Sequence, residues 1–136
     1  MISPNRSILV IILLLSTVVL NAQDAPVEIP QPRRMEEFKF STQGYAKMML
    51  DGFFVELSNN PANQGHIIIY PKTERQQRTI EKIITSQIKF RSYDPSRITL
   101  VRGPKHADGV IQFWSVPPGA DAPKPVWGNE MPRGLR

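Results

Sequence analysis

The sequence predicts one α+β domain, in which two helices pack on a single face of a mixed β-sheet. His66 to Tyr70 is a short run that is almost wholly apolar and β-branched at its centre, which is typical of a strand buried on both faces. A segment with isoleucines at helical spacing and a second apolar strand, 98–102, follow it. Two strands joined by such a helix are most simply parallel neighbours with a right-handed crossover.

The first part of the domain is predicted to be a strand followed by a helix. Residues 36–40 alternate in polarity, with Phe38 and Phe40 on one face of the strand. Ser41 or Thr42 can cap a helix over residues 43–58, which ends before Pro61 because helices seldom continue into the residue before proline. The predicted core-facing stripe of this helix comprises Ala46, Met49, Leu50, Phe53, Phe54 and Leu57.

The second part is predicted to be a helix and two strands, which completes the order β-α-β-α-β-β. The helix spans about Thr73 to Lys89, and Thr73 serves as its N-cap. Residues 98–102 form the next strand. Residues 110–116 are expected to return as its antiparallel hairpin partner, with apolar side chains on both faces.

The N-terminal end resembles a secretory signal peptide. Arg6 precedes the apolar segment Ile8 to Leu20, and Ala22 offers a small residue for cleavage, so residues 1–22 are predicted to be removed. The alternative is an uncleaved membrane anchor, although this apolar segment is shorter than the roughly 20 residues that span a bilayer. The mature chain is therefore expected to be periplasmic or secreted, without membrane contact after cleavage.

Proline-rich segments flank the predicted domain, which covers residues 36–116. Residues 23–35 are interpreted as a linker, and residues 117–136 as an extended, largely disordered tail. The chain has no cysteine, which excludes a disulfide framework and a thiolate nucleophile. The domain must then rest on its hydrophobic core alone.

The net charge of +5 is concentrated in the second half of the domain. A run of basic side chains favours an anionic partner or forms the solvated face of a helix. Nucleic acid is not the predicted partner, because the chain is predicted to be exported and the basic run lacks interleaved aromatic residues. Against only Glu74, Glu81 and Asp94, residues 71–105 hold the basic side chains Lys72, Arg75, Arg78, Lys82, Lys89, Arg91, Arg97, Arg102 and Lys105.

Several short motifs occur in the order in which one known family carries them. Phe38-Lys39-Phe40 is similar to that family's opening strand, and Leu50-Asp51 with Asn60-Pro61 follows its first helix and helix stop. Ile67 to Glu74 aligns with the family's Ile-x-Val-x-Gly-His-Thr-Asp motif. Ser96-Arg97-Ile98 matches the start of the family's next strand. Residues 36–116 thus resemble the OmpA-like (OmpA/MotB C-terminal) peptidoglycan-binding domain.

This resemblance implies a binding site at the start of the second helix. In the family, an aspartate and a later arginine hold the carboxylate and amine of a peptidoglycan stem peptide. Here Glu74 stands in the aspartate position beside Thr73, and Arg75 or Arg78 supplies the guanidinium. Arginine suits this role because its planar fork can donate two parallel hydrogen bonds to a carboxylate. The helix N-terminus also favours anions, although a capped and solvated first turn would show the same residues.

The sequence also bears on two other classes of function. A protein-interaction module, with an envelope protein as partner, would use the last strand, the proline-rich tail, and Trp114 and Trp127 as aromatic anchors. An enzyme is not predicted, because no nucleophile elbow, phosphate loop or zinc-protease helix occurs. His66 is interpreted as structural, and His106-Ala107-Asp108 lacks a third metal ligand. No metal or cofactor is therefore expected.

Overall fold

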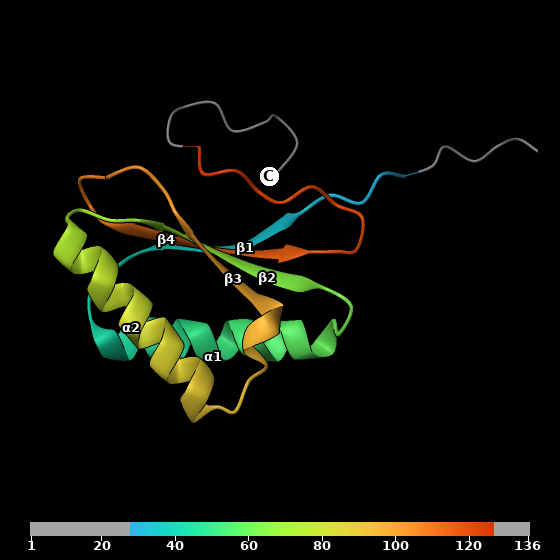
Figure 1. The fold of residues 1–136 in the computed structure, drawn as a ribbon, viewed down its shortest axis with the longest axis horizontal. Coiled ribbons are helices and arrows are strands. Elements are labelled where there is room, and N and C mark those ends of the chain that lie inside the picture. Colours follow the sequence, from blue (N-terminus) through green and yellow to red (C-terminus); the bar gives the residue numbers. More distant parts are fainter. Residues whose placement is uncertain (1–27, 127–136) are drawn as a thin grey trace, which may run out of the picture.

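In the computed structural model, residues 28–126 form one mixed sheet with two helices on one of its faces, as Figure 1 shows. The predicted α+β class and the placement of the helices are confirmed. The predicted signal peptide lies outside the described residues. The elements are β1 (Arg33–Lys39), α1 (Gln43–Asn59), β2 (Gln64–Tyr70), α2 (Glu74–Phe90), the short 3-10 helix η2 (Pro95–Arg97), β3 (Ile98–Arg102) and β4 (Val110–Val116).

The predicted elements all occur, with small differences in their ends. β3 and β4 span the predicted residues, and both helices agree with the predicted ranges to within a residue or so at each end. β1 begins at Arg33 rather than Glu36, inside the segment interpreted as linker. A β-bulge between Arg34 and Glu36 interrupts the pairing of β1 with β4. The bulge disturbs the polar/apolar alternation there, so the first residues of β1 do not show the pattern of a strand.

The strand order is β1-β4-β2-β3, and this order corrects one prediction. β2 and β3 are parallel neighbours as predicted, with Ile67 opposite Leu100. The predicted hairpin between β3 and β4 is wrong, because β4 lies between β1 and β2 and is antiparallel to both. Every residue of β4 is buried, whereas β3 is half-exposed at the sheet edge. An internal position lets this two-sided apolar strand bury both faces.

The main core lies between the helices and the sheet. Both predicted helix caps form: the hydroxyl of Thr42 accepts a hydrogen bond from the Tyr45 N–H at 3.2 Å, and Thr73 caps α2 in the same way. The predicted stripe of α1 is buried apart from Met49, which is half-buried and packs on the core. The core from helices and strands together includes Leu50, Phe53, Phe54, Leu57, Ile67, Ile69, Ile80, Ile84, Ile111 and Phe113.

The opposite face of the sheet is also apolar, although no described helix covers it. Ile68, Tyr70, Val110 and Trp114 form a second buried cluster on this face. Residues 117–126 contain a turn but no helix or strand, and they run back across this helix-free face (Figure 1). The remainder of the predicted tail, 127–136, lies outside the described residues. Neither α1 nor α2 is long and apolar enough to cross a membrane.

Truncation of Leu57 tests the core between the helices and the sheet. Leu57 is fully buried, so we expect Leu57→Ala to lower the free energy of unfolding by about 2–5 kcal/mol through lost burial and a residual cavity. Val55 lies on the same helix and is 61% exposed, and Val55→Ala should cost less than about 0.5 kcal/mol. Urea denaturation of both variants measures the difference, and equal losses would contradict the assigned core.

Candidate functional site

The start of α2 lies at the carboxyl end of β2, beside the carboxyl end of the parallel strand β3. In open α/β sheets, ligands commonly bind outside this edge. The loop after β3 is tied across the end of β2 by two hydrogen bonds, from Gly103 N–H to the Ile69 carbonyl (2.8 Å) and from His106 N–H to the Pro71 carbonyl (2.9 Å). The backbone just before the first turn of α2 is therefore held by main-chain hydrogen bonds.

Gln76 connects this loop to the first turn of α2. Its Oε1 accepts a hydrogen bond from the Lys72 N–H at 2.6 Å. Gly109 has a positive φ of 65°, and a Cβ atom there would lie 2.4 Å from Gln76 Oε1. A side chain at this position would have to displace the Gln76 amide and adopt a φ that L residues rarely adopt. The loop, the cap and the helix start form one packed unit that presents the side chains of the first turn.

The structure places the four predicted site residues at this helix start. The Thr73 hydroxyl is engaged in capping, because it accepts a hydrogen bond from the Gln76 N–H at 3.1 Å. Glu74, Arg75 and Arg78 are exposed. Within residues 28–126, the hydrogen bonds and ion pairs involve none of these three side chains. Thr73 is thus a structural residue, and the other three are charged groups open to solvent.

The two arginines of the site differ from every other arginine in residues 28–126. Arg33 and Arg34 pair with glutamates. Arg91 and Arg102 pair with carboxylates on other elements. Arg97 donates to three backbone carbonyls at the end of α1 and in the loop that follows. Arg75 and Arg78 are therefore the two guanidinium groups in this part of the chain that the fold itself does not use.

The next turn of α2 carries a charge that is already neutralised. Arg102 donates to both carboxylate oxygens of Glu81, at 2.7 and 2.9 Å, and Gln77 adds a third hydrogen bond at 2.7 Å. The hydrogen bond from Arg102 and then that from Gln77 lower the pKa of Glu81. Glu81 therefore does not offset Arg75 and Arg78. With Lys72 exposed beside the first turn, this end of α2 is net positive.

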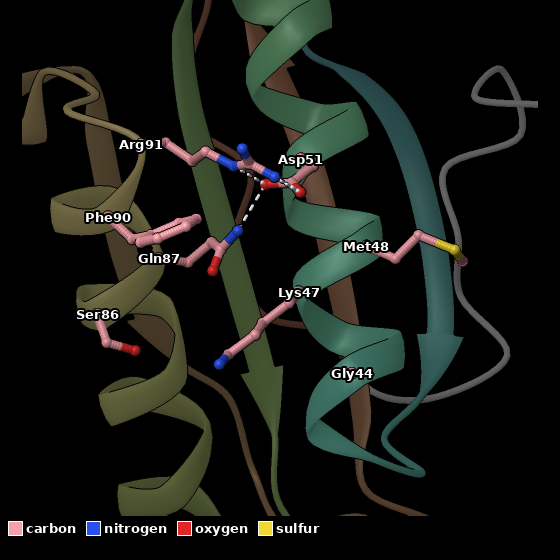
Figure 2. Close-up of a pocket in the computed structure, with 8 residues that line it drawn as sticks. All are labelled: Gly44, Lys47, Met48, Asp51, Ser86, Gln87, Phe90 and Arg91. Atoms are coloured by element: carbon pink, nitrogen blue, oxygen red, sulfur yellow. Dashed lines mark hydrogen bonds and ion pairs between the residues drawn. The ribbon is translucent and has the colours of Figure 1, made fainter.

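A shallow groove between α1 and α2 contains a second polar cluster, shown in Figure 2. Asp51 of α1 points toward Gln87 and Arg91 of α2, which donate to its Oδ1 at 2.6 and 2.8 Å. Arg91 also donates to Oδ2, so the pair is bidentate. The hydrogen bond from Arg91 is the main cause of the lowered pKa of Asp51; burial opposes it and Gln87 supports it. The exposed side chains of Met48 and Phe90 line the groove.

Sequence reasoning did not find this cluster. Gln87 and Arg91 are four residues apart, which places them on one face of a helix and is a usable signal. Their partner Asp51 lies on another helix, and no local pattern connects residues that far apart in the chain. Because every oxygen of the Asp51 carboxylate is engaged, the cluster joins the two helices and does not offer a free acid or base.

The structure separates the two histidines. His66 lies on the helix-free face opposite Trp114, and burial lowers its pKa. His106 Nδ1 accepts a hydrogen bond from the Asp108 N–H at 3.2 Å, and the Asp108 carboxylate pairs with Lys39 at 2.9 Å. Within residues 28–126 no three His, Asp or Glu side chains are grouped as metal ligands would be.

One of the two predicted aromatic anchors is buried in the structure. Trp114 is only 7% exposed and belongs to the buried cluster of the helix-free face. β4, which carries it, has strand neighbours on both sides, so it offers no free edge to a partner. Trp127 lies outside the described residues. An exposed Trp114 side chain and a free edge of β4 are therefore ruled out as contacts of an interaction module.

No protein-family model matches this sequence, and no curated protein matches it either. The resemblance to the OmpA-like domain therefore rests on the motifs themselves. It remains a prediction.

The Asp51 cluster predicts a pH-dependent contribution to stability. The folded-state pKa of Asp51 is lowered below its unfolded value of about 3.9, so its stabilisation is present above that value. It is lost as the pH falls through the folded pKa. We expect Asp51→Asn to be less stable than wild type at pH 7, with the difference shrinking at acidic pH.

Thermal or urea unfolding from pH 7 to pH 2 measures this difference. Asp121→Asn removes an exposed carboxylate that lies outside the groove, and it is the matched control. A stability gap for Asp51→Asn that stays constant over the whole pH range would contradict the assignment of the ion pair.

Proposed function

We propose that this chain is an exported, non-enzymatic domain of the cell envelope that binds a carboxylate-bearing ligand, with a peptidoglycan stem peptide as the first candidate. The observation that supports it is that the side chains of Arg75 and Arg78 are exposed and make no hydrogen bond or ion pair within residues 28–126. The fold uses the other arginines of residues 28–126 for its own ion pairs and caps, and leaves these two exposed at the start of α2. The family resemblance carries over one of these two arginines together with Glu74.

The proposed contacts follow from the chemistry of these groups. A free guanidinium can donate two parallel hydrogen bonds to a ligand carboxylate. Glu74, one residue before Arg75, is free to accept from a ligand amine. The helix N-terminus adds a partial positive charge that favours the ligand carboxylate over the amine. One end of α2 therefore offers both charges that an amino-acid-like group requires.

The scaffold holds the backbone from which the binding side chains extend. The cap at Thr73, the Gln76 contact with Lys72 and the loop at Gly109 hold the first turn in place. A backbone that is already ordered adds no ordering cost of its own on binding. Export itself is proposed from Arg6, the apolar segment 8–20 and Ala22 in the sequence.

Co-sedimentation with purified peptidoglycan sacculi tests the proposal, with the chain from Gln23 to Arg136. A charge-assisted hydrogen bond contributes about 1.5 kcal/mol or more, so Arg75→Ala/Arg78→Ala should weaken binding at least about tenfold. Lys82→Ala/Lys89→Ala removes the same charge from exposed positions further along α2 and is the matched control. Its binding should stay close to wild type at moderate salt.

The outcomes separate a site from general charge attraction. Binding that survives moderate salt and is lost only in the arginine variant supports the site at the start of α2. Equal losses in both variants would indicate non-specific attraction to anionic wall polymers. If the wild-type chain does not bind sacculi, the peptidoglycan proposal is contradicted and a divergent interaction module is favoured.

A further inference from the structure

The helix-free face of the sheet contains two aromatic residues with hydrogen-bonding groups. Tyr70 and Trp114 are 1% and 7% exposed, and they pack with Ile68 and Val110. On this side of the sheet lie the lead-in to β1 and residues 117–126 (Figure 1), and Gly103 of the loop after β3 lies against the Tyr70 ring. The described chain over this aromatic face therefore includes residues 117–126, which form neither helix nor strand.

A polar network holds the aromatic groups in position. Arg34 donates to Glu37 Oε2 at 2.6 Å, and Gln112 Nε2 donates to the same oxygen at 2.7 Å. The orientation of the Gln112 amide is thereby set, and its Oε1 accepts from the Trp114 indole N–H at 3.1 Å. The Tyr70 hydroxyl lies 3.3 Å from the Val126 carbonyl, with Gln112 Oε1 a longer alternative at 3.5 Å.

The covering segment has the composition and spacing of a polyproline-type ligand. Prolines occupy positions 117, 118, 123 and 125. After the turn, Ala120 and Pro123 are the half-buried residues, and three positions later the Val126 carbonyl meets Tyr70. Three residues is the repeat of a polyproline II helix, and aromatic surfaces with hydrogen-bond donors are the usual receptors for such segments.

A single turn directs this segment back over its own sheet. Ala120 N–H donates to the Pro117 carbonyl at 3.1 Å, and Gly119 has a φ of 81°. Proline at the second position and a positive φ at the third define a type II turn. A residue with a branched Cβ is strongly disfavoured at such a φ. The closed arrangement thus depends on Gly119.

We propose that the helix-free face is a binding surface for residues 117–126, and that two copies of this chain exchange these segments to form a dimer. The occupant is the segment of a second copy, because its sequence already fits the face in the closed chain. In the exchanged dimer each sheet keeps the same cover, and only the turn at Gly119 is opened. Exchange of an identical element is a low-cost route to a dimer.

Exchange depends on how deeply residues 117–126 are buried and on the concentration of other copies relative to the chain's own segment. No residue of 117–126 is buried, and Val126 is 53% exposed, so the segment has few contacts to break as it leaves. A short connection gives the chain's own segment a millimolar effective concentration at the face. The wild-type chain is therefore monomeric at micromolar concentration. It exchanges where copies are concentrated on a common surface.

The test uses the chain from Gln23 to Arg136 and strains the turn. Gly119→Val should oppose the closed arrangement and produce a dimer at micromolar concentration, measured by sedimentation velocity. Gly52→Val is the control, because Gly52 is exposed on α1, has no neighbouring atoms within 4 Å of an added Cβ and has no positive φ. It adds the same apolar group and should remain monomeric.

Two further measurements identify the contact in the dimer. Tyr70→Phe removes the hydroxyl that meets Val126 but keeps the ring. Two such bonds occur per dimer, so adding this change to Gly119→Val should raise the dimer dissociation constant between about fivefold and a hundredfold. A free peptide with the sequence of residues 117–126 should dissociate the Gly119→Val dimer, whereas a peptide with the same composition in scrambled order should not.

Each result bears on the proposal. Dimerisation of Gly119→Val that is weakened by Tyr70→Phe and reversed by the peptide supports segment exchange. A Gly119→Val chain that remains monomeric overturns it. A dimer that neither Tyr70→Phe nor the peptide affects would show association through another surface, and also overturns it. Because Arg75 and Arg78 are unchanged in these variants, the outcome is independent of the test for ligand binding.

Discussion

The fold depends on two neighbouring strands, β2 and β4, that are buried on both faces. Ile67 and Ile69 pack toward the helices, while Ile68 and Tyr70 pack on the other side, and all four are at most 1% exposed. A sheet whose central pair is apolar on both sides needs a cover on each face. The helices provide one cover, and the extended segment 117–126 crosses the other (Figure 1). The two faces of the sheet therefore differ in their cover: packed helices on one face, and a segment without helix or strand on the other.

The same constraint fixes where the candidate site lies. Because β4 must lie between β1 and β2, the connection from β3 passes around the carboxyl end of β2 and bonds to Ile69 and Pro71. This connection between β3 and β4 fixes the residues just before α2 and brings Gly109 against Gln76. The first turn of α2 is thus held by the connection that the strand order requires. The exposed charged side chains at the start of α2 therefore extend from a backbone that is held in place.

Local patterns in the sequence predicted the elements well and the pairing of distant elements less well. The helix caps, the helix stripes, and strands β3 and β4 follow from spacing and turn residues within short windows. The hairpin between β3 and β4 was wrong because sequence neighbours were assumed to pair, whereas burial of both faces of β4 required an internal position. The Asp51–Arg91 pair joins two helices and has no local signature. At the site, the sequence indicated which residues to consider, but only the structure distinguished the capping role of Thr73 from the free side chains.

Charge pairing provides a way to separate scaffold from candidate site in this chain. An arginine that bonds to a carboxylate or to helix-end carbonyls stabilises the fold, and its removal leaves a partner unsatisfied. Arg91, Arg97 and Arg102 are of this kind. Within residues 28–126 Arg75 and Arg78 have no such partner, and positive charges near a helix N-terminus carry a cost through repulsion with the helix dipole. A bound anion would remove that cost. This is the physical reason for expecting a negatively charged ligand group at the start of α2.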